Sequence, residues 1–405
     1  MLYLHLAWRN IWRNKRRTLI SVSSVLFAVL FALLTRSMQL GSYNYMIRNV
    51  VRLSTGYMQI HAQGFWEKRS IDLAFRDTEE LRRRIGAVPH VTRLIPRLQT
   101  FALAASATGT RGAMINGVDP EAENAMNGLQ RKVVQGSYLT AADSGALVGE
   151  ALAATLGLDL GDTLIIYGQG YHGLTAAGMF PIQGIVRYPN KEMNASLVYL
   201  SMRTAQELFA MPGMINSLSI MLEHPRDQEA VRTEVRARLG EQYELMVWQE
   251  MMPEMVQGIE VDNAGGIIMI AILYVIIGFG IFGTVMMMTL ERRREFGVLI
   301  AVGMKRGRLA VMTATESILL SLLGVLAGTV VAAPALVFLY NNPIRLTGEA
   351  AEVMLEFGFE PLLPFSLDPS IFISQTLAVL VIALVSTSYP VLVLRRLDAV
   401  AAMRA

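Results

Sequence analysis

A run of 25 residues without a single charge, residues 266–290, most strongly limits what this chain can fold into. At 1.5 Å rise per residue, a helix of this length exceeds the ~30 Å hydrocarbon core of a bilayer, so the run predicts a membrane-spanning helix. A short basic segment, residues 291–308, follows and leads into a second long apolar run, residues 309–340. Two spanning helices joined by a basic loop are therefore the predicted centre of the protein.

Two further runs have the same character. Residues 18–35 carry no charge before Arg36, and residues 371–394 carry none at all. Hydrophobic residues make up 53% of the chain and charged residues only 17%, below the ~25% charged residues of ordinary soluble domains. The sequence thus predicts four transmembrane helices, which we place at residues 18–40, 266–290, 309–340 and 371–394.

The charges beside these spans predict their orientation. Segments 1–17, 291–308 and 395–405 together carry fourteen basic and three acidic residues, whereas segment 341–370 carries one basic and five acidic residues. Because short cytoplasmic loops are enriched in Lys and Arg, we expect both termini and the 291–308 loop in the cytoplasm. Residues 41–265 and the 341–370 loop then lie outside. The net charge of +3 is mainly a signal of topology, and it does not favour nucleic-acid binding.

The N-terminal segment has the pattern of an amphipathic helix. Trp8, Ile11 and Trp12 fall at helical spacing, with arginines on another face, so residues 2–17 predict a helix lying in the cytoplasmic interface. A cleaved signal peptide is the alternative. The apolar run is longer than is usual for one, and residues 34–37 make a poor small-residue cleavage site, which favours an uncleaved helix.

The long segment 41–265 predicts a mixed α/β extracytoplasmic domain. Helical spacing continues beyond the first span and precedes the second, which indicates either a two-helix stalk or two unrelated surface helices. Between them, short strands and helices alternate with turn residues. We expect a βαβ-like subdomain built from both ends of the segment, with a β-rich subdomain inserted at about residues 106–212. Because the chain has no cysteine, the domain must be stabilised by its core, which its size permits.

Residues 168–173 match the dinucleotide-binding pattern G-x-G-x-x-G. A nucleotide site needs this turn to open a helix, but Gly178 and Pro181 stand where that helix would run, so a hairpin loop is favoured. The five histidines are scattered without metal-ligand spacing. We therefore expect no catalytic residues, cofactor or metal in this chain.

The third span contains one acid and one close-packing motif. Glu316 lies about one turn inside the cytoplasmic boundary. It is either a functional acid or a structural partner of a nearby arginine, and the position so close to the interface favours the pairing. Gly324 and Gly328 have the small-xxx-small spacing that lets two helices approach closely.

The loop at residues 291–304, Glu-Arg-Arg-Arg-Glu-Phe-Gly-Val-Leu-Ile-Ala-Val-Gly-Met, resembles the cytoplasmic loop of the MacB/FtsX/LolC–LolE family of ABC transporter permeases. The resemblance covers nearly the whole chain. It also includes residues 8–18, 115–120, 147–153, 160–164 and 389–404.

The resemblance implies a transporter subunit and not an enzyme. Two permease protomers, identical or homologous, would join a cytoplasmic ABC ATPase dimer that holds ATP and Mg²⁺, in the bacterial inner membrane. The loop would carry a coupling helix that docks on the ATPase, and the ATPase cycle would be transmitted mechanically to the outer domain. The coupling residues carried over are Arg293, Arg294, Glu295, Phe296, Gly297, Gly303, Met304, Lys305 and Arg306, with Phe296, Val298, Leu299 and Met304 as the apolar anchor.

Residues 54–61 look more like the lipoprotein-releasing branch of that family. Such a protein would extract lipoproteins or other lipid-anchored cargo from the membrane lipid and pass them to a periplasmic carrier. It should have an apolar cleft between the first and second spans of two protomers. The predicted cleft residues are Leu40, Tyr43, Met46, Ile47, Met255, Ile259, Ile267 and Ile270.

Two other functions fit the same resemblance. One is efflux of peptides, toxins or macrolides through a periplasmic adaptor. The other is signalling to a cell-wall hydrolase without transport. A membrane enzyme is disfavoured because the sequence shows no catalytic cluster.

Overall fold

The computed structural model describes residues 2–13, 15–188, 190–356, 360–386 and 388–389. The chain divides into two compact units. The first consists of residues 1–44, 258–345 and 363–405, and the second of residues 45–257 and 346–362. Residues 346–362, which the sequence assigned only to a loop between two spans, thus belong to the same unit as the α/β domain.

Among the described residues, six helices build the first unit, and two of them, α2 and α11, also contribute residues to the second. They are α1 (Leu2–Arg13), α2 (Lys15–Val50), α11 (Pro253–Glu291), α12 (Arg293–Ala301), α13 (Arg306–Asn341) and α15 (Pro369–Ser386). Within α2, α11, α13 and α15, the described chain has four helices long and apolar enough to cross a membrane, as predicted. The predicted residues 390–394 of the last span lie outside the described residues.

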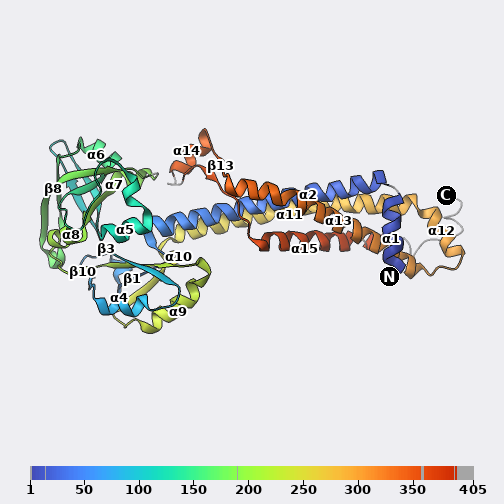
Figure 1. Ribbon diagram of the computed structural model, residues 1–405, viewed down its shortest axis with the longest axis horizontal. Coiled ribbons are helices and arrows are strands. Elements are labelled where there is room, and N and C mark those ends of the chain that lie inside the picture. Colours follow the sequence, from blue (N-terminus) through green and yellow to red (C-terminus); the bar gives the residue numbers. More distant parts are fainter. Residues whose placement is uncertain (1, 14, 189, 357–359, 387, 390–405) are drawn as a thin grey trace. The chain divides into compact units, whose positions relative to one another are not determined.

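The four long helices run side by side (Figure 1) and bury one face of each in a shared apolar core. Val29, Ile277, Leu336 and Val379 belong to this core. Large apolar side chains such as Phe279 also cover the outer faces. An apolar surface on both the inner and the outer face of a bundle is the pattern expected where lipid is the solvent.

Gly324 and Gly328 lie where α13 meets α2. A Cβ atom added at Gly324 would stand 2.5 Å from the Cβ of Val25, and one at Gly328 would stand 2.9 Å from the carbonyl oxygen of Leu26. Real Cβ atoms do not come so near a neighbour. The two helices therefore approach each other through these glycines, in the way that the small-xxx-small spacing predicts.

Helix α1 buries Ala7 and Ile11 and exposes Trp8 and Trp12. The two indole rings pack edge to face with centroids 6.0 Å apart. The hydroxyl of Thr18 donates a hydrogen bond to the carbonyl oxygen of Ile11 at 2.6 Å, which links α2 to α1. The exposed indoles suit a membrane interface, where tryptophan is enriched.

The second unit is built on one ten-stranded mixed sheet with the order β12-β1-β11-β3-β4-β9-β6-β8-β5, in which β7 also pairs with β3 and β8. Its strands are β1 (Met58–Ala62), β3 (Val91–Ala105), β4 (Thr110–Val118), β5 (Val133–Gly136), β6 (Ala146–Gly149), β7 (Thr163–Gln169), β8 (Thr175–Val186), β9 (Leu197–Ser201), β11 (Ser217–Leu222) and β12 (Tyr243–Val247). Four short strands lie outside it: β2 (Phe75–Arg76), β10 (Met214–Ile215), β13 (Ile344–Arg345) and β14 (Leu362–Leu363).

Short helices connect these strands. The α-helices are α3 (Phe65–Lys68), α4 (Glu79–Gly86), α5 (Pro120–Asn127), α6 (Glu150–Leu156), α7 (Lys191–Ser196), α8 (Met202–Leu208), α9 (Gln228–Arg238), α10 (Trp248–Met251) and α14 (Glu349–Glu356). A π-helix, η1 (Val51–Thr55), continues α2, and the 3₁₀ turns are η2 (Leu129–Lys132), η3 (Tyr171–Gly173) and η4 (Pro225–Asp227).

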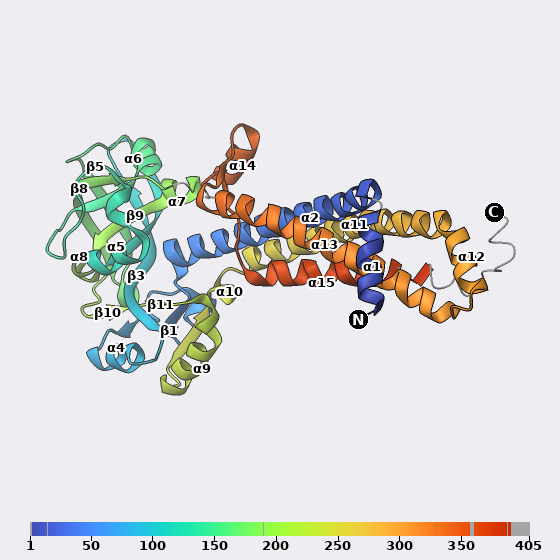
Figure 2. The ribbon, with the colours of Figure 1, turned by 45° about the vertical axis from the view of Figure 1, so that its right-hand side comes forward.

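The sheet has two main apolar cores, and we call the parts of the domain around them its two subdomains. The predicted insertion at about residues 106–212 stays a prediction. In the first core, α4 and α9 cover one sheet face (Figure 2) with Ile85 and Val235 against strand residues such as Ile60. The second core contains residues 98–211 almost exclusively. The subdomains nevertheless share one sheet, because the 15-residue strand β3 contributes Leu94 to the first core and Leu98 to the second.

Residues 168–173 form a hairpin connection. Strand β7 ends at Gln169, whose Cα partner is Thr175 at the start of β8, and the two strands are antiparallel. The turn contains η3 and no longer helix. The G-x-G-x-x-G pattern therefore lacks the helix that a dinucleotide would need, as predicted.

His61 is a buried titratable group on β1. Its Nδ1 lies 2.7 Å from the carbonyl oxygen of Asn216, and its ring stacks on Phe65 with centroids 4.7 Å apart. Burial lowers the pKa of His61 to about 4, although the hydrogen bond to Asn216 acts in the opposite direction. The imidazole is therefore neutral in the folded protein at neutral pH, with the proton on Nδ1.

We predict that the second unit loses stability between about pH 6.5 and pH 4. Above pH 6.5, His61 is neutral in both the folded and the unfolded chain. Below it, only the unfolded chain takes up the proton, so the free energy of unfolding falls by roughly 3 kcal/mol by pH 4. Hydrogen exchange of β1 and β11 in the full chain measures this loss. His61→Gln should flatten the pH dependence, and an unchanged slope would contradict the assignment.

Candidate functional site

The basic loop between α11 and α13 contains the short helix α12. This helix ends with three backbone hydrogen bonds, from Val302, Gly303 and Met304 to carbonyl oxygens of α12 at 2.9–3.0 Å. Gly303 has φ +102°, a conformation that glycine adopts without strain and that commonly ends a helix. A nine-residue helix is thus presented between two membrane spans.

The inner face of α12 is held against α13 by an apolar cluster. Phe296 is 1% exposed and packs with Leu309, Ala310 and Met312. Leu299, Ile300 and Met304 pack against the same cluster. Phe296, Leu299 and Met304, three of the four predicted anchor residues, therefore face this cluster, where Phe296 positions α12 and offers little surface to a partner.

An ion-pair network at the N-terminal end of α12 also fixes this helix. Arg292 donates to Glu316 at 2.7 Å and to Glu295 at 3.0 Å, and Arg13 of α1 donates to Glu295 at 2.6 Å. Partial burial alone would raise the pKa of Glu295, but the hydrogen bonds and charges of Arg292 and Arg13 hold it below its usual value. Glu316 thus has the arginine partner that its position predicted, and the network links α1, α12 and α13.

The outer face of α12 combines apolar and basic side chains. Val302 is 83% exposed and Val298 is 47% exposed. Arg293, Arg294 and Lys305 are exposed around them. An apolar centre with a rim of cations has the character of a protein docking surface. Val302 was not predicted as a docking residue, because nothing in the sequence indicates that a valine beside a helix end is exposed.

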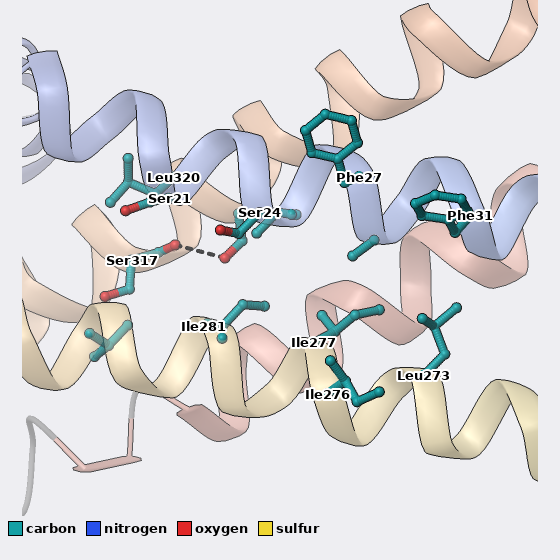
Figure 3. Close-up of a pocket in the computed structure, with 15 residues that line it drawn as sticks. Ser21, Ser24, Phe27, Phe31, Leu273, Ile276, Ile277, Ile281, Ser317 and Leu320 are labelled. Carbon is teal, nitrogen blue, oxygen red and sulfur yellow. Dashed lines mark hydrogen bonds between the residues drawn. The ribbon is translucent and has the colours of Figure 1, made fainter.

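A cavity of about 360 Å³ lies between α2, α11 and α13. In Figure 3, Phe27 and Phe31 of α2 stand opposite Leu273, Ile276 and Ile277 of α11. Four serines, which are Ser21, Ser24, Ser317 and Ser321, line one end of this cavity, and we call it the serine end. The remaining lining residues are Val25, Ala28, Gly280, Ile281, Val285 and Leu320.

The serine end contains one unsatisfied donor. Ser24 donates to the carbonyl oxygen of Ile20 at 2.9 Å, and Ser321 donates to that of Ser317 at 3.0 Å. The hydroxyl of Ser317 is buried and has no hydrogen-bond partner among the described residues. A buried polar atom without a partner is costly, and it makes Ser317 available to a polar group that enters the cavity.

The predicted cleft residues lie elsewhere on the same helices, and none lines this cavity. In the first unit, Leu40 packs on the bundle core, Tyr43 and Ile270 are buried, Ile259 is half-buried and Ile267 is 56% exposed. In the second unit, Met46 is half-buried, and Ile47 and Met255 pack against the core under α4 and α9. Their role as a cleft between two protomers stays a prediction.

Comparison with known proteins places this fold in a family. The MacB-like periplasmic core domain matches residues 18–238, and the FtsX-like permease C-terminal domain matches residues 267–399. The fold and the loop define a multi-pass transport permease of the inner membrane. The chain belongs to the ABC transporter permeases that combine a MacB-like periplasmic core domain with an FtsX-like permease domain.

Individual relatives are distant. The lipoprotein-releasing system transmembrane protein LolC of Xylella fastidiosa is 21% identical, over 97% of this chain and 96% of that protein. An uncharacterized ABC transporter permease of Mycobacterium tuberculosis is 27% identical over 56% of this chain, and the match spans only 26% of that relative's length. The periplasmic region of MacB from Actinobacillus actinomycetemcomitans has a TM-score of 0.36 at 13% identity, covering 52% of this chain and 96% of that one.

We predict that Arg292→Gln loosens α12 from α13. The change leaves the buried Glu316 without its charged partner, which costs roughly 3 kcal/mol for a buried pair. Hydrogen exchange over residues 293–301 should rise accordingly. Arg293→Gln, which removes the same charge from an exposed neighbour, is the matched control and should change little. Equal protection in the two variants would show that the pair does not hold the helix.

Proposed function

We propose that this chain is the permease of an ATP-driven complex that extracts lipoproteins, or cargo with a similar lipid anchor, from the inner membrane. Two permease protomers, identical or homologous, join a cytoplasmic ATPase dimer that holds ATP and Mg²⁺. Both termini and α12 lie in the cytoplasm, and the α/β unit hands the cargo to a periplasmic carrier. The observation that carries this proposal is the similarity to LolC, which extends over almost the full length of both proteins.

The outer face of α12 is the proposed docking surface for the ATPase. Val298 and Val302 would enter an apolar groove, and Arg293, Arg294 and Lys305 would set the register at its rim. Because Phe296 and Arg292 fix α12 to α13, a displacement of the docked ATPase passes into the third span. This is the mechanical transmission that the family resemblance implies.

The cavity between α2, α11 and α13 is the proposed site for an acyl chain of the cargo. Its volume lies within the ~300–1,000 Å³ of small-molecule sites. Apart from the four serines at one end, its walls are apolar, as a hydrocarbon chain requires.

Efflux of peptides or macrolides is the second candidate, and it is favoured by the match to the MacB-like core domain. The two functions differ in what accumulates when the protein is removed. Lipoproteins retained in the inner membrane support the first. Drug or peptide sensitivity with normal lipoprotein sorting supports the second, and chaining cells would support signalling to a cell-wall hydrolase.

We predict that Arg294→Glu and Val302→Asp each abolish co-purification with the ATPase while the permease still inserts. The first reverses a rim charge, and the second places a carboxylate at the apolar centre. Arg345→Glu, the same charge reversal on the predicted outer side, is the matched control and should co-purify normally. Retention of the ATPase by both α12 variants would remove the docking assignment.

We predict that Ala28→Trp blocks cargo release. The indole would fill part of the cavity from α2, so an acyl chain could no longer enter. Release of a radiolabelled lipoprotein from spheroplasts to a soluble carrier should fall at least about tenfold, the equivalent of 1.4 kcal/mol. Leu326→Trp, on the exposed face of α13, is the control for inserting a tryptophan. Normal release by Ala28→Trp would rule out the cavity as the acyl site.

A further inference from the structure

The cavity between α2, α11 and α13 opens onto the outer surface of the bundle at its side but is closed at one end. Phe27, Phe31 and Ile276 line the cavity and are exposed, so hydrocarbon chains of the surrounding lipid reach it from the side. Past Phe31 the two helices close again, because Ala32 of α2 and Ile270 of α11 are buried. An acyl chain can therefore enter from the lipid, whereas its path along the helices is blocked.

A group of polar side chains joins α2 to α11 just past this closure. Tyr43 donates a hydrogen bond to the carboxylate of Asp262 at 2.6 Å, and Arg36 donates one to the side-chain oxygen of Asn263 at 3.0 Å. The side-chain amide of Gln39 also bridges the two helices. It donates to the hydroxyl oxygen of Tyr43 at 2.8 Å and to the backbone carbonyl of Asp262 at 3.3 Å. We call these five residues the clasp.

The clasp lies on the same faces of α2 and α11 as the cavity. On α2, the cavity residue Ala28 is eight residues from Arg36 and fifteen from Tyr43. On α11, the cavity residue Leu273 is eleven residues from Asp262. These intervals are close to whole numbers of 3.6-residue turns, so the residues follow one another along one face of each helix. The clasp therefore stands across the continuation of the cavity.

Another face of α2 is fixed more firmly, to the segment that leads into α15. Ser37 is buried and donates from its hydroxyl to the carbonyl oxygen of Ser366 at 2.6 Å, and the N–H of Ser366 donates to the carbonyl oxygen of Ser37 at 3.0 Å. A Cβ atom at Gly41 would overlap the carbonyl oxygen of Pro364, so backbone meets backbone there. The clasp consists of side chains instead, and Asp262 is exposed. Because water competes for exposed hydrogen bonds, the contact between α2 and α11 is the weaker of the two.

We propose that the clasp is a gate, which keeps an acyl chain in the cavity until the ATPase cycle moves α11 away from α2. The gate rests on the proposed function, in which the cavity holds an acyl chain, and adds a regulated exit to it. Helix α12, the proposed docking surface, is joined to α11 through Arg292, so a displacement of the docked ATPase also pulls on α11. Helix α2 stays fixed to the segment before α15. With the clasp parted, the cavity would continue to the end of both spans, and the acyl chain could leave toward the carrier.

A thiol placed in the cavity tests the gate without any cargo. Because the chain has no cysteine, Ala28→Cys supplies a single probe. In spheroplasts that express the full chain, a charged thiol reagent that cannot cross the membrane is added from outside, and labelling is measured on the purified chain. A thiol reacts as the thiolate, which forms where water reaches it. We expect slow labelling while the clasp is intact.

Gln39→Ala with Tyr43→Phe, added to the probe, leaves the bond from Arg36 to Asn263 but removes the others described above. Labelling should become about tenfold faster, as the loss of one or two hydrogen bonds would give, and a damaged fold that failed to insert could not produce this gain. Asn341→Ala with Asn342→Ala removes amides that donate to carbonyl oxygens of their own helix. It is the matched control and should label like the probe alone. Equal labelling of the clasp variant and the probe alone would overturn the gate.

A reversible link across the clasp tests the same gate with cargo. Tyr43→Cys with Asp262→Cys, joined by a short bis-methanethiosulfonate linker, should keep a radiolabelled lipoprotein bound to the permease and prevent its release to the carrier, and reduction of the linker should restore release. Arg203→Cys with Glu207→Cys, an exposed pair within α8, is the matched control and should release normally when linked.

The two experiments separate the gate from the proposed function. Faster labelling of the clasp variant in a chain that releases no lipoprotein would support the gate and remove lipoprotein release as the function. Normal release by the chain linked across the clasp would overturn the gate and leave lipoprotein release in place.

Discussion

A hydrocarbon interior offers no hydrogen-bond partners, and this constraint underlies the arrangement of the whole chain. Each span must satisfy its own backbone as a helix, so four long helices are the framework on which the other parts depend. Charged side chains are expensive in this environment, which places them at the helix ends. The ion pair between Arg292 and Glu316 stands at one such end, with its two members 2.7 Å apart.

That ion pair has a mechanical consequence. Glu316 belongs to a span and Arg292 to the start of the α12 segment, so their contact joins a membrane helix to the surface that faces the proposed ATPase. Phe296 makes the second contact through its buried ring. One charged and one apolar contact, both made with α13, leave this short helix little freedom to move against it. A flexible loop with the same outward side chains could bind a partner but could not transmit its movement.

The sequence predicted what depends on local pattern. Length and lack of charge were enough to predict the spans, Gly178 and Pro181 excluded a helix after the glycine pattern, and the position of Glu316 indicated an arginine partner. The remaining features depend on how each helix is rotated about its own axis, or on pairing between residues far apart in the sequence. A span such as residues 18–35 has no charged face, so no charge pattern indicated that Ser21, Ser24, Phe27 and Phe31 share one cavity. Likewise, no local signal joins two subdomains into one sheet through β3.

The end of α2 shows how a helix can be fixed to a sheet without cysteine. Helix α2 continues into the π-helix η1, whose last carbonyl groups accept hydrogen bonds from side chains of the sheet. The carbonyl oxygen of Ser54 accepts one from the guanidinium of Arg97, and that of Thr55 accepts one from the side-chain amide of Gln59 at 2.8 Å. Arg97 is itself buried and paired with Glu123 at 2.7 Å. Because Arg97 lies in β3, the strand common to both cores, a displacement along α2 reaches both subdomains through one side chain.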